Sequence, residues 1–269
     1  MLQQLDQQAG WHLGGIEPPV MIRLLGSFGL LKEGRPVVVP SGGKTEALLS
    51  LLALRHGRCV PRDTILGIIW PDHDPTLAGQ ALSSLIYSLR KQLGPLLGGA
   101  MPIVHVEGCY QLNCDAGVSI DLLYFEEAVQ EGDRHRRLGD RRSALDAWGR
   151  AISVYTGDLW SGMDVHAAVE RERLRACYLT ILARLADDYY ERGDYSACIE
   201  YAGRLLASDP CREDAHRLIM RCYVRQGERA QALRQYRLCA EILRSEFDAL
   251  PEALTADLYE QVRSAPDSI

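Results

Sequence analysis

Hydrogen-bonding side chains recur at helical spacing between Asp74 and Leu93. They are Gln80, Ser83, Ser84, Tyr87 and Ser88. Arg90 and Lys91 add positive charge near the end of the stretch, and residues 75–93 contain no Asp or Glu. Amide and hydroxyl groups can bond to base edges, and basic groups can bind phosphates. A face of this composition therefore suits the major groove of DNA.

One amphipathic helix would position these side chains. Its opposite face is apolar at Ala78, Leu82, Leu85, Ile86, Leu89 and Leu93. Asp74 or Thr76 can cap the start, Pro75 suits the first turn, and Gly94-Pro95 ends the helix. Taken alone, the pattern also fits an ordinary surface helix, so the neighbouring elements decide between the two interpretations.

The neighbouring elements indicate a winged helix. Short strands are expected within 20–26 and 30–40, with turn signals at 26–27 and 32–36, and helices over 44–56 and 61–70. After the polar helix, residues 102–106 and 109–113 alternate around Glu107-Gly108, as in a hairpin. In such an arrangement the third helix reads the groove and the hairpin forms the wing.

The second half of the chain repeats with a period of 34 residues. Tyr189 and Tyr223 are 34 residues apart, and so are Gly193 and Gly227. This period predicts tetratricopeptide-like pairs of helices, which stack and leave a concave face for binding. A weaker copy has its turn at Gly139-Asp140, and the extra residues before the next copy include an expected loop over 156–164.

Charge and composition are compatible with a DNA module joined to a protein-binding module. The net charge is −6 overall, but residues 20–115 carry nine Lys and Arg against seven Asp and Glu. The eight cysteines form no CxxC pair and are expected to be reduced thiols, mainly in the core, as in a cytoplasmic protein. Residues 1–19 lack Lys and Arg and are interpreted as a disordered leader, and no apolar run is long enough to cross a membrane.

Enzymatic, metal and nucleotide sites find little support. Ser41-Gly42-Gly43-Lys44-Thr45 resembles a phosphate-binding loop, but the position that needs the earlier glycine is Val38. The histidines of the second half, at 135, 166 and 216, have no partner at metal-ligand spacing, and His216 is expected to be packed. We predict that the chain is not an enzyme and holds no metal or cofactor.

Five short stretches, taken in order, resemble the OmpR-type winged helix and, more narrowly, the Streptomyces antibiotic regulatory protein (SARP) family of transcriptional activators. They are residues 26–30, 47–53, 68–72, 82–94 and 108–112. Residues 121–125 and 170–174, the Trp160 loop, Gly227 and Ala232-Leu233 with Tyr236 look like the bacterial transcriptional activation domain of the same family. The resemblance implies a mainly α fold: a winged helix-turn-helix domain over 20–115, followed by a tetratricopeptide-like activation domain over 116–265.

The resemblance also implies the partners. It makes 76–93 the recognition helix, 103–113 the wing, and the loop of Trp70, Asp72, His73 and Asp74 the part that faces RNA polymerase. The expected partners are double-stranded promoter DNA with repeated half-sites, RNA polymerase holoenzyme and a second copy of the chain. The wing tip is formed by Glu107, Gly108 and Cys109. It carries an acidic residue where a basic or neutral one would suit contact with phosphates better.

Candidate DNA contacts come from the recognition helix and from two basic residues that precede it in the chain. Gln80, Ser83, Ser84 and Tyr87 are candidates for base edges, and the candidates for phosphates are Lys44, Arg62, Ser88, Arg90 and Lys91. Two alternatives stay open: a tetratricopeptide scaffold acting mainly through protein contacts, and a regulator whose helical array binds a small molecule.

Overall fold

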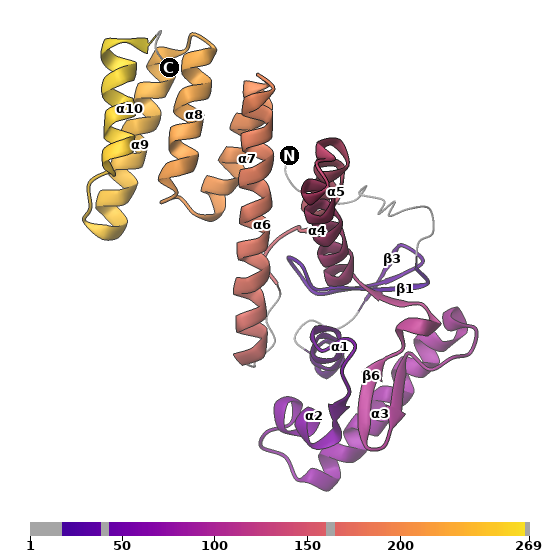
Figure 1. Cartoon of the computed structure of the whole chain (residues 1–269). Helices are drawn as coiled ribbons and strands as arrows, with labels where there is room; N and C mark the ends of the chain where they lie inside the picture. The colour runs from indigo at the N-terminus through magenta and orange to yellow at the C-terminus, as the bar shows by residue number, and fades with distance from the viewer. Residues whose placement is uncertain (1–17, 39–42, 160–164, 267–269) are drawn as a thin grey trace. The chain divides into compact units, whose positions relative to one another are not determined.

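Residues 18–38, 43–159 and 165–266 are described by the computed structural model of the chain (Figure 1). By its contacts, the chain divides into one unit of residues 1–130 and 153–174 and another of residues 131–152 and 175–269. The expected leader, residues 1–19, lies almost entirely outside the described residues, and so does Trp160. The domain boundary at 115/116 stays a prediction.

A four-stranded sheet opens the first unit. Its strands are β1 (Val20–Arg23), β2 (Gly29–Lys32), β3 (Arg35–Val37) and β7 (Val118–Ile120), in the order β3-β2-β1-β7. The antiparallel β2–β3 turn places Glu33 and Gly34 at positive φ, 47° and 72°, as a tight two-residue hairpin requires. Strand β7 pairs in parallel with β1, with Val20 opposite Val118.

Strand β7 was missed by the sequence analysis, which expected helix from residue 117 onward. Three residues are too few to show a period, and the partner strand is 98 positions away for Val118 and Val20. Ile22 and Ile120 are fully buried, so this pairing forms part of the core of the first unit.

The expected helices and hairpin of the winged helix follow in the predicted order, with one short strand between the first two helices that the sequence analysis did not expect. They are α1 (Lys44–Leu54), β4 (Val60–Pro61), α2 (Arg62–Ile69), α3 (Pro75–Leu93), a 3₁₀ turn η2 (Gly94–Leu97), β5 (Ile103–Val106), β6 (Cys109–Leu112) and a second turn η3 (Cys114–Ala116). Strand β4 joins the β5–β6 hairpin in a three-stranded sheet of order β4-β6-β5. Because β4 leads directly into α2, the wing is anchored to the helices.

Asp121 fixes the end of β1 to the first turn of α4 (Asp121–Arg137). Its buried carboxylate accepts hydrogen bonds from the backbone N–H groups of Leu24 and Leu25 at 2.9 Å and of Leu122 at 2.8 Å. Burial raises the pKa of Asp121 to about 6, although these N–H donors lower it in part. Thr156 adds a second tie by donating to the carbonyl of Leu25.

Three helix pairs and a final helix follow in the part of the chain that the structure describes. The pairs are α4 with α5 (Arg141–Val154), α6 (Val165–Glu191) with α7 (Tyr195–Ser208) and α8 (Glu213–Arg225) with α9 (Arg229–Phe247), and α10 (Ala253–Ser264) follows. The turns place Gly139, Gly193 and Gly227 at φ of 76°, 77° and 78°, a conformation that favours glycine. The 34-residue period therefore marks repeated helix turns, as predicted.

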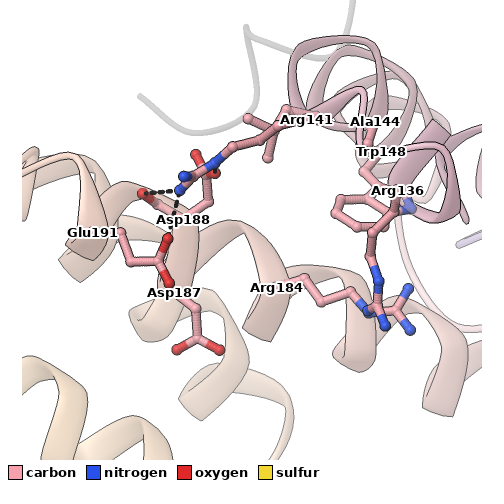
Figure 2. A pocket seen from close by; sticks show the side chains of 10 residues that line it. Arg136, Arg141, Ala144, Trp148, Arg184, Asp187, Asp188 and Glu191 are labelled. Atoms are coloured by element: carbon pink, nitrogen blue, oxygen red, sulfur yellow. Dashed lines mark hydrogen bonds and ion pairs between the residues drawn. The ribbon is translucent and has the colours of Figure 1, made fainter.

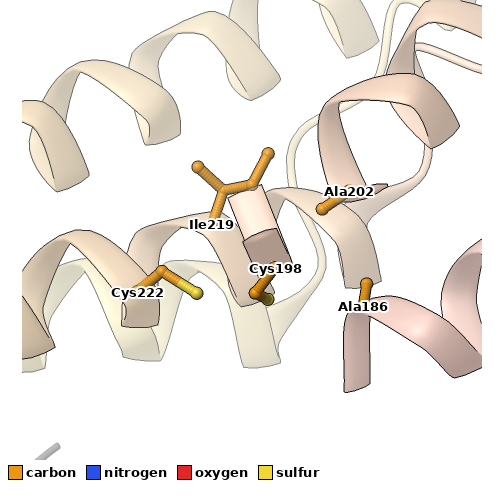
Figure 3. Close-up of a cluster of buried hydrophobic side chains, with 5 residues drawn as sticks. All are labelled: Ala186, Cys198, Ala202, Ile219 and Cys222. Carbon is orange, nitrogen blue, oxygen red and sulfur yellow. The ribbon is translucent and has the colours of Figure 1, made fainter. Parts of the chain in front are cut away.

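Small side chains let the helices of the second unit approach closely. Ala186, Cys198, Ala202, Ile219 and Cys222 form one buried cluster, drawn in Figure 3. Tyr189 and Tyr201 stack at a centroid distance of 5.3 Å beside it. The prediction that Cys198 packs in the core is confirmed, because this side chain is fully buried.

The cysteines correct one expectation. All eight thiols are free, but only Cys198, Cys222 and Cys239 are buried. Cys59, just before the short strand β4, and Cys114, at the start of η3, are exposed. Placing the thiols mainly in the core was therefore wrong. Among the described residues, none of the helices combines the length and apolar character needed to cross a membrane.

Candidate nucleic-acid interface

Helix α3 is bounded by the residues that the sequence marked. Asp74 accepts hydrogen bonds from the backbone N–H groups of Thr76 at 2.9 Å and Leu77 at 3.1 Å, while Pro75 occupies the first turn. Its inner face is buried at Ala78, Gly79, Leu82, Leu89 and Leu93. The helix is thereby held in one orientation, with its opposite face outward.

All four base-edge candidates lie on the exposed face of α3. Gln80, Ser83, Ser84 and Tyr87 are exposed, and Tyr87 keeps 69% of its surface open to solvent. The hydroxyls of Ser83 and Ser84 donate to the carbonyls of Gly79 and Gln80 at 3.0 Å. These hydroxyls therefore keep lone pairs free to accept from exocyclic amino groups of cytosine or adenine.

Two positively charged side chains lie at the C-terminal end of this face of α3. Ser88, Arg90 and Lys91 are exposed, and neither basic group has an ion-pair partner within the described part of the chain. Cations are favourable at the C-terminal end of a helix, where the macrodipole is negative. Two unpaired cations beside an acid-free face can bind phosphate without first breaking an internal ion pair.

Arg62 links α3 to the wing. Its guanidinium lies against Gly79, where an added Cβ would be 1.8 Å from Nη2, so a larger residue at this position would require the Arg62 side chain to move. The backbone N–H of Arg62 donates to the carbonyl of Gly108 at the wing tip, at 3.0 Å. A single residue therefore connects the phosphate candidates of α3 with the hairpin.

The wing tip itself is acidic and tightly turned. Glu107 and Gly108 have φ of 51° and 80°, as expected of a two-residue hairpin, and Glu107 is exposed. Cys109 is half-buried opposite Pro61 of β4. An exposed carboxylate at the tip repels phosphate. Arg62 is therefore a better candidate for a phosphate contact than the residues of the wing tip.

Lys44 is already engaged. Its ammonium donates to the carbonyl of Ile69 and lies 5.6 Å from the centroid of the Trp70 ring. The sequence analysis could not foresee this contact, because it depends on how α1 packs against α2. Lys44 is therefore a weaker phosphate candidate than Arg90 or Lys91.

In the loop after α2, two of the four side chains named as facing RNA polymerase are accessible to a partner. Trp70 is 6% exposed, and Asp74 is occupied as the cap of α3. Asp72 and His73 are exposed, and the backbone N–H of His73 donates to the carbonyl of Trp70 at 3.3 Å. A protein partner of this loop would therefore meet Asp72 and His73.

The sequence analysis missed Leu77 as a candidate. This side chain is 63% exposed and precedes Gln80, Ser84 and Tyr87 by three, seven and ten residues, so it extends the same line. Helical spacing from Gln80 was the signal that could have found it. An exposed leucine on such a face can contact the methyl group of thymine.

Comparisons with known proteins agree with this architecture. Residues 120–263 match the family model described as the bacterial transcriptional activator domain. The Regulatory protein AfsR of Streptomyces coelicolor is 25% identical over 247 residues, which cover 91% of this chain and 24% of that protein. The Regulatory protein DnrI of Streptomyces peucetius is 25% identical over 260 residues, which cover 93% of this chain and 94% of that protein.

A solved structure supports the fold. Mycobacterium tuberculosis EmbR, solved in complex with a low-affinity phosphopeptide, superposes with a TM-score of 0.72 at 22% identity, over 94% of this chain and 68% of that one. This likeness confirms the predicted fold class, a small N-terminal β-containing region followed by a tetratricopeptide-like helical region. The chain spans about a quarter of the length of the AfsR proteins that it matches.

Proposed function

The chain belongs to the bacterial transcriptional activator domain family, and from this premise we propose that it is a sequence-specific DNA-binding activator. The family and the matched relatives are transcriptional regulators, which confirms the prediction that the chain is not an enzyme. Its resemblance to the SARP regulators is likewise confirmed by AfsR and DnrI. DNA binding and polymerase recruitment are our proposals for this chain.

The observation that carries the proposal is the exposed, acid-free face of α3. Gln80, Ser83, Ser84 and Tyr87 would meet base edges, and Leu77 would extend this contact toward the start of the helix. A good pair of hydrogen bonds to a base contributes about 1–3 kcal/mol of discrimination against the wrong base. Several such contacts along one helix are enough to prefer one short sequence.

Phosphates would be bound at the rim of this face. Arg90 and Lys91 at the end of α3 and Arg62 beside Gly79 are the proposed cations, with Ser88 as a neutral donor. Residues 20–115 carry a net charge of only +2, from nine basic and seven acidic residues. One module would therefore bind weakly, and we propose a homodimer on repeated half-sites about one helical turn apart.

The remaining parts have proposed roles as well. Asp72 and His73, the exposed residues after α2, would face RNA polymerase holoenzyme, and the helical region would support assembly of the complex. Because promoter DNA lies in the bacterial cytoplasm, we place the chain there.

Selection of DNA from a random pool tests the proposal. The full chain should enrich one repeated motif, and its affinity for that motif should fall linearly with the logarithm of salt concentration. Enrichment of no motif together with a flat salt response would refute DNA binding. Protein capture that persisted in Lys91→Glu without any DNA binding would favour a scaffold instead.

A further inference from the structure

A hollow of about 260 Å³ lies in the second unit, bordered by the end of α4, the first half of α5 and the second half of α6 (Figure 2). Ala144 and Trp148 of α5 form an apolar part of its lining, and Trp148 is only 4% exposed. This volume suits a small molecule, since pockets for larger ligands begin at about 300 Å³. Nothing in the DNA-binding proposal uses this hollow.

Charges line the hollow in two groups. Figure 2 shows the carboxylates of Asp187, Asp188 and Glu191 on one side, while Arg136 and Arg184 lie toward Trp148 on the other. The hollow therefore has an acidic and a basic end, with an apolar surface between them.

Most of these charges already have partners. Arg141 binds Asp188 and binds Glu191 at 2.8 Å, and Asp188 also pairs with Arg192 at 2.8 Å. Arg184 pairs with Asp133 of α4 and lies 5.1 Å from the centroid of the Trp148 ring. These contacts form the fixed frame of the hollow.

Two opposite charges lack a partner in the part of the chain that the structure describes. Arg136 is exposed with no ion pair, and Asp187 has neither a cation nor a hydrogen-bond donor. Partial desolvation of its carboxyl group and the nearby carboxylates of Asp214 and Glu191 raise the pKa of Asp187. Asp187 is thus an acid that a ligand cation would stabilise, and Arg136 is a base without an anion.

We propose that this hollow binds a small zwitterion. Asp187 would hold its ammonium group, Arg136 its carboxylate, and the aliphatic part would lie on Ala144 and Trp148. A purely anionic ligand would meet Asp187 and Glu191, and a purely cationic one would meet Arg136 and Arg184. Only a molecule with one charge of each sign matches both ends.

A series of amino acids with terminal charges measures the fit. Glycine, β-alanine, 4-aminobutyrate, 5-aminopentanoate and 6-aminohexanoate differ only in the distance between ammonium and carboxylate. Calorimetric titration of the full chain should find one length that binds best, because Arg136 and Asp187 line the hollow from two different helices. An alkylamine and an alkanoate of the same length should bind at least about tenfold more weakly, since each lacks one charged contact.

Variants assign the two ends. Asp187→Asn and Arg136→Gln should each weaken binding of the best zwitterion at least about tenfold. Asp146→Asn and Arg142→Gln change the same groups at exposed positions of α5 outside the hollow and should bind normally. All four substituted positions are exposed, so urea midpoints should stay close to that of the unsubstituted chain.

Binding of no member of the series, or equal binding by the two hollow variants and their controls, would overturn the proposal. The titration contains no DNA, so its outcome is independent of the proposed function. A chain that binds the zwitterion but enriches no DNA motif would keep this site and refute only the activator.

Discussion

Replacing both cations at the end of α3 should lower the salt dependence of DNA binding. Arg90 and Lys91 are exposed and have no internal ion pair in the described chain, so each is free to neutralise one phosphate. The combined variant Arg90→Gln, Lys91→Gln removes both contacts and leaves Gln80 and Tyr87 in place. Affinity for specific and non-specific DNA should therefore fall together, while the preferred sequence should not change.

The magnitude follows from the number of contacts. Each neutralised phosphate contributes about 0.9 to the slope of log affinity against log salt, so the two cations contribute about 1.8 per bound module. Between about 50 and 200 mM salt, that difference corresponds to about a twelvefold change in affinity. Fluorescence anisotropy with a labelled duplex across this range measures both slopes directly.

A charge-matched control separates local contacts from net charge. Arg142→Gln combined with Arg225→Gln removes two exposed arginines of the second unit and should leave the slope unchanged. Circular dichroism checks that α3 persists, since cations at a helix end contribute about 0.3–1 kcal/mol each. If the α3 variant and the control had the same slope as the unsubstituted chain, α3 would not be the phosphate-binding element.

Three further outcomes are expected. Leu77→Ala should weaken binding about fourfold on thymine-containing sites and by less where deoxyuridine replaces the contacted thymine, whereas equal losses on both duplexes would exclude a methyl contact. Burial lowers the pKa of His216 from 6.5, so only the unfolded chain takes up a proton as pH first falls below 6.5, and stability is lost there. Urea unfolding at about pH 7.5 and about pH 5 should show this loss, smaller in His216→Gln, and an equal loss in both would assign it to other groups. Gly26→Ala should destabilise by about 2–4 kcal/mol, because φ is 94° and the new Cβ would be 2.6 Å from Thr156 Oγ1. Gly57→Ala, with positive φ but open space, should cost about 1 kcal/mol, and equal urea midpoints for the two variants would contradict the close approach.

Local patterns were sufficient to locate most helices and the exposed face of α3. The apolar spacing from Ala78 to Leu93, the Asp74 cap and Pro75 act within a few residues of one another, so the sequence displays them directly. The 34-residue period likewise requires only that each repeat keep its glycine turn and small packing residues. Leu77 was within reach of the same spacing argument and was overlooked.

Only the tertiary structure decided which side chains are engaged. The ammonium of Lys44 is bound to Ile69 by the packing of α1 on α2, while Arg62 lies against Gly79 and reaches the wing through its backbone. No period in the sequence reports these contacts, because each joins segments that are separate along the chain.

The same reason explains strand β7 and the uncompensated pair in the second unit. Val118 pairs with Val20, and Arg136 and Asp187 line one hollow although 51 residues separate them. Their meeting depends on chain closure and helix packing, which composition and spacing do not encode locally. The sequence by itself determined most of the helices and which of their faces are polar; the fold determined the β7 pairing and which of those polar groups remain free to bind.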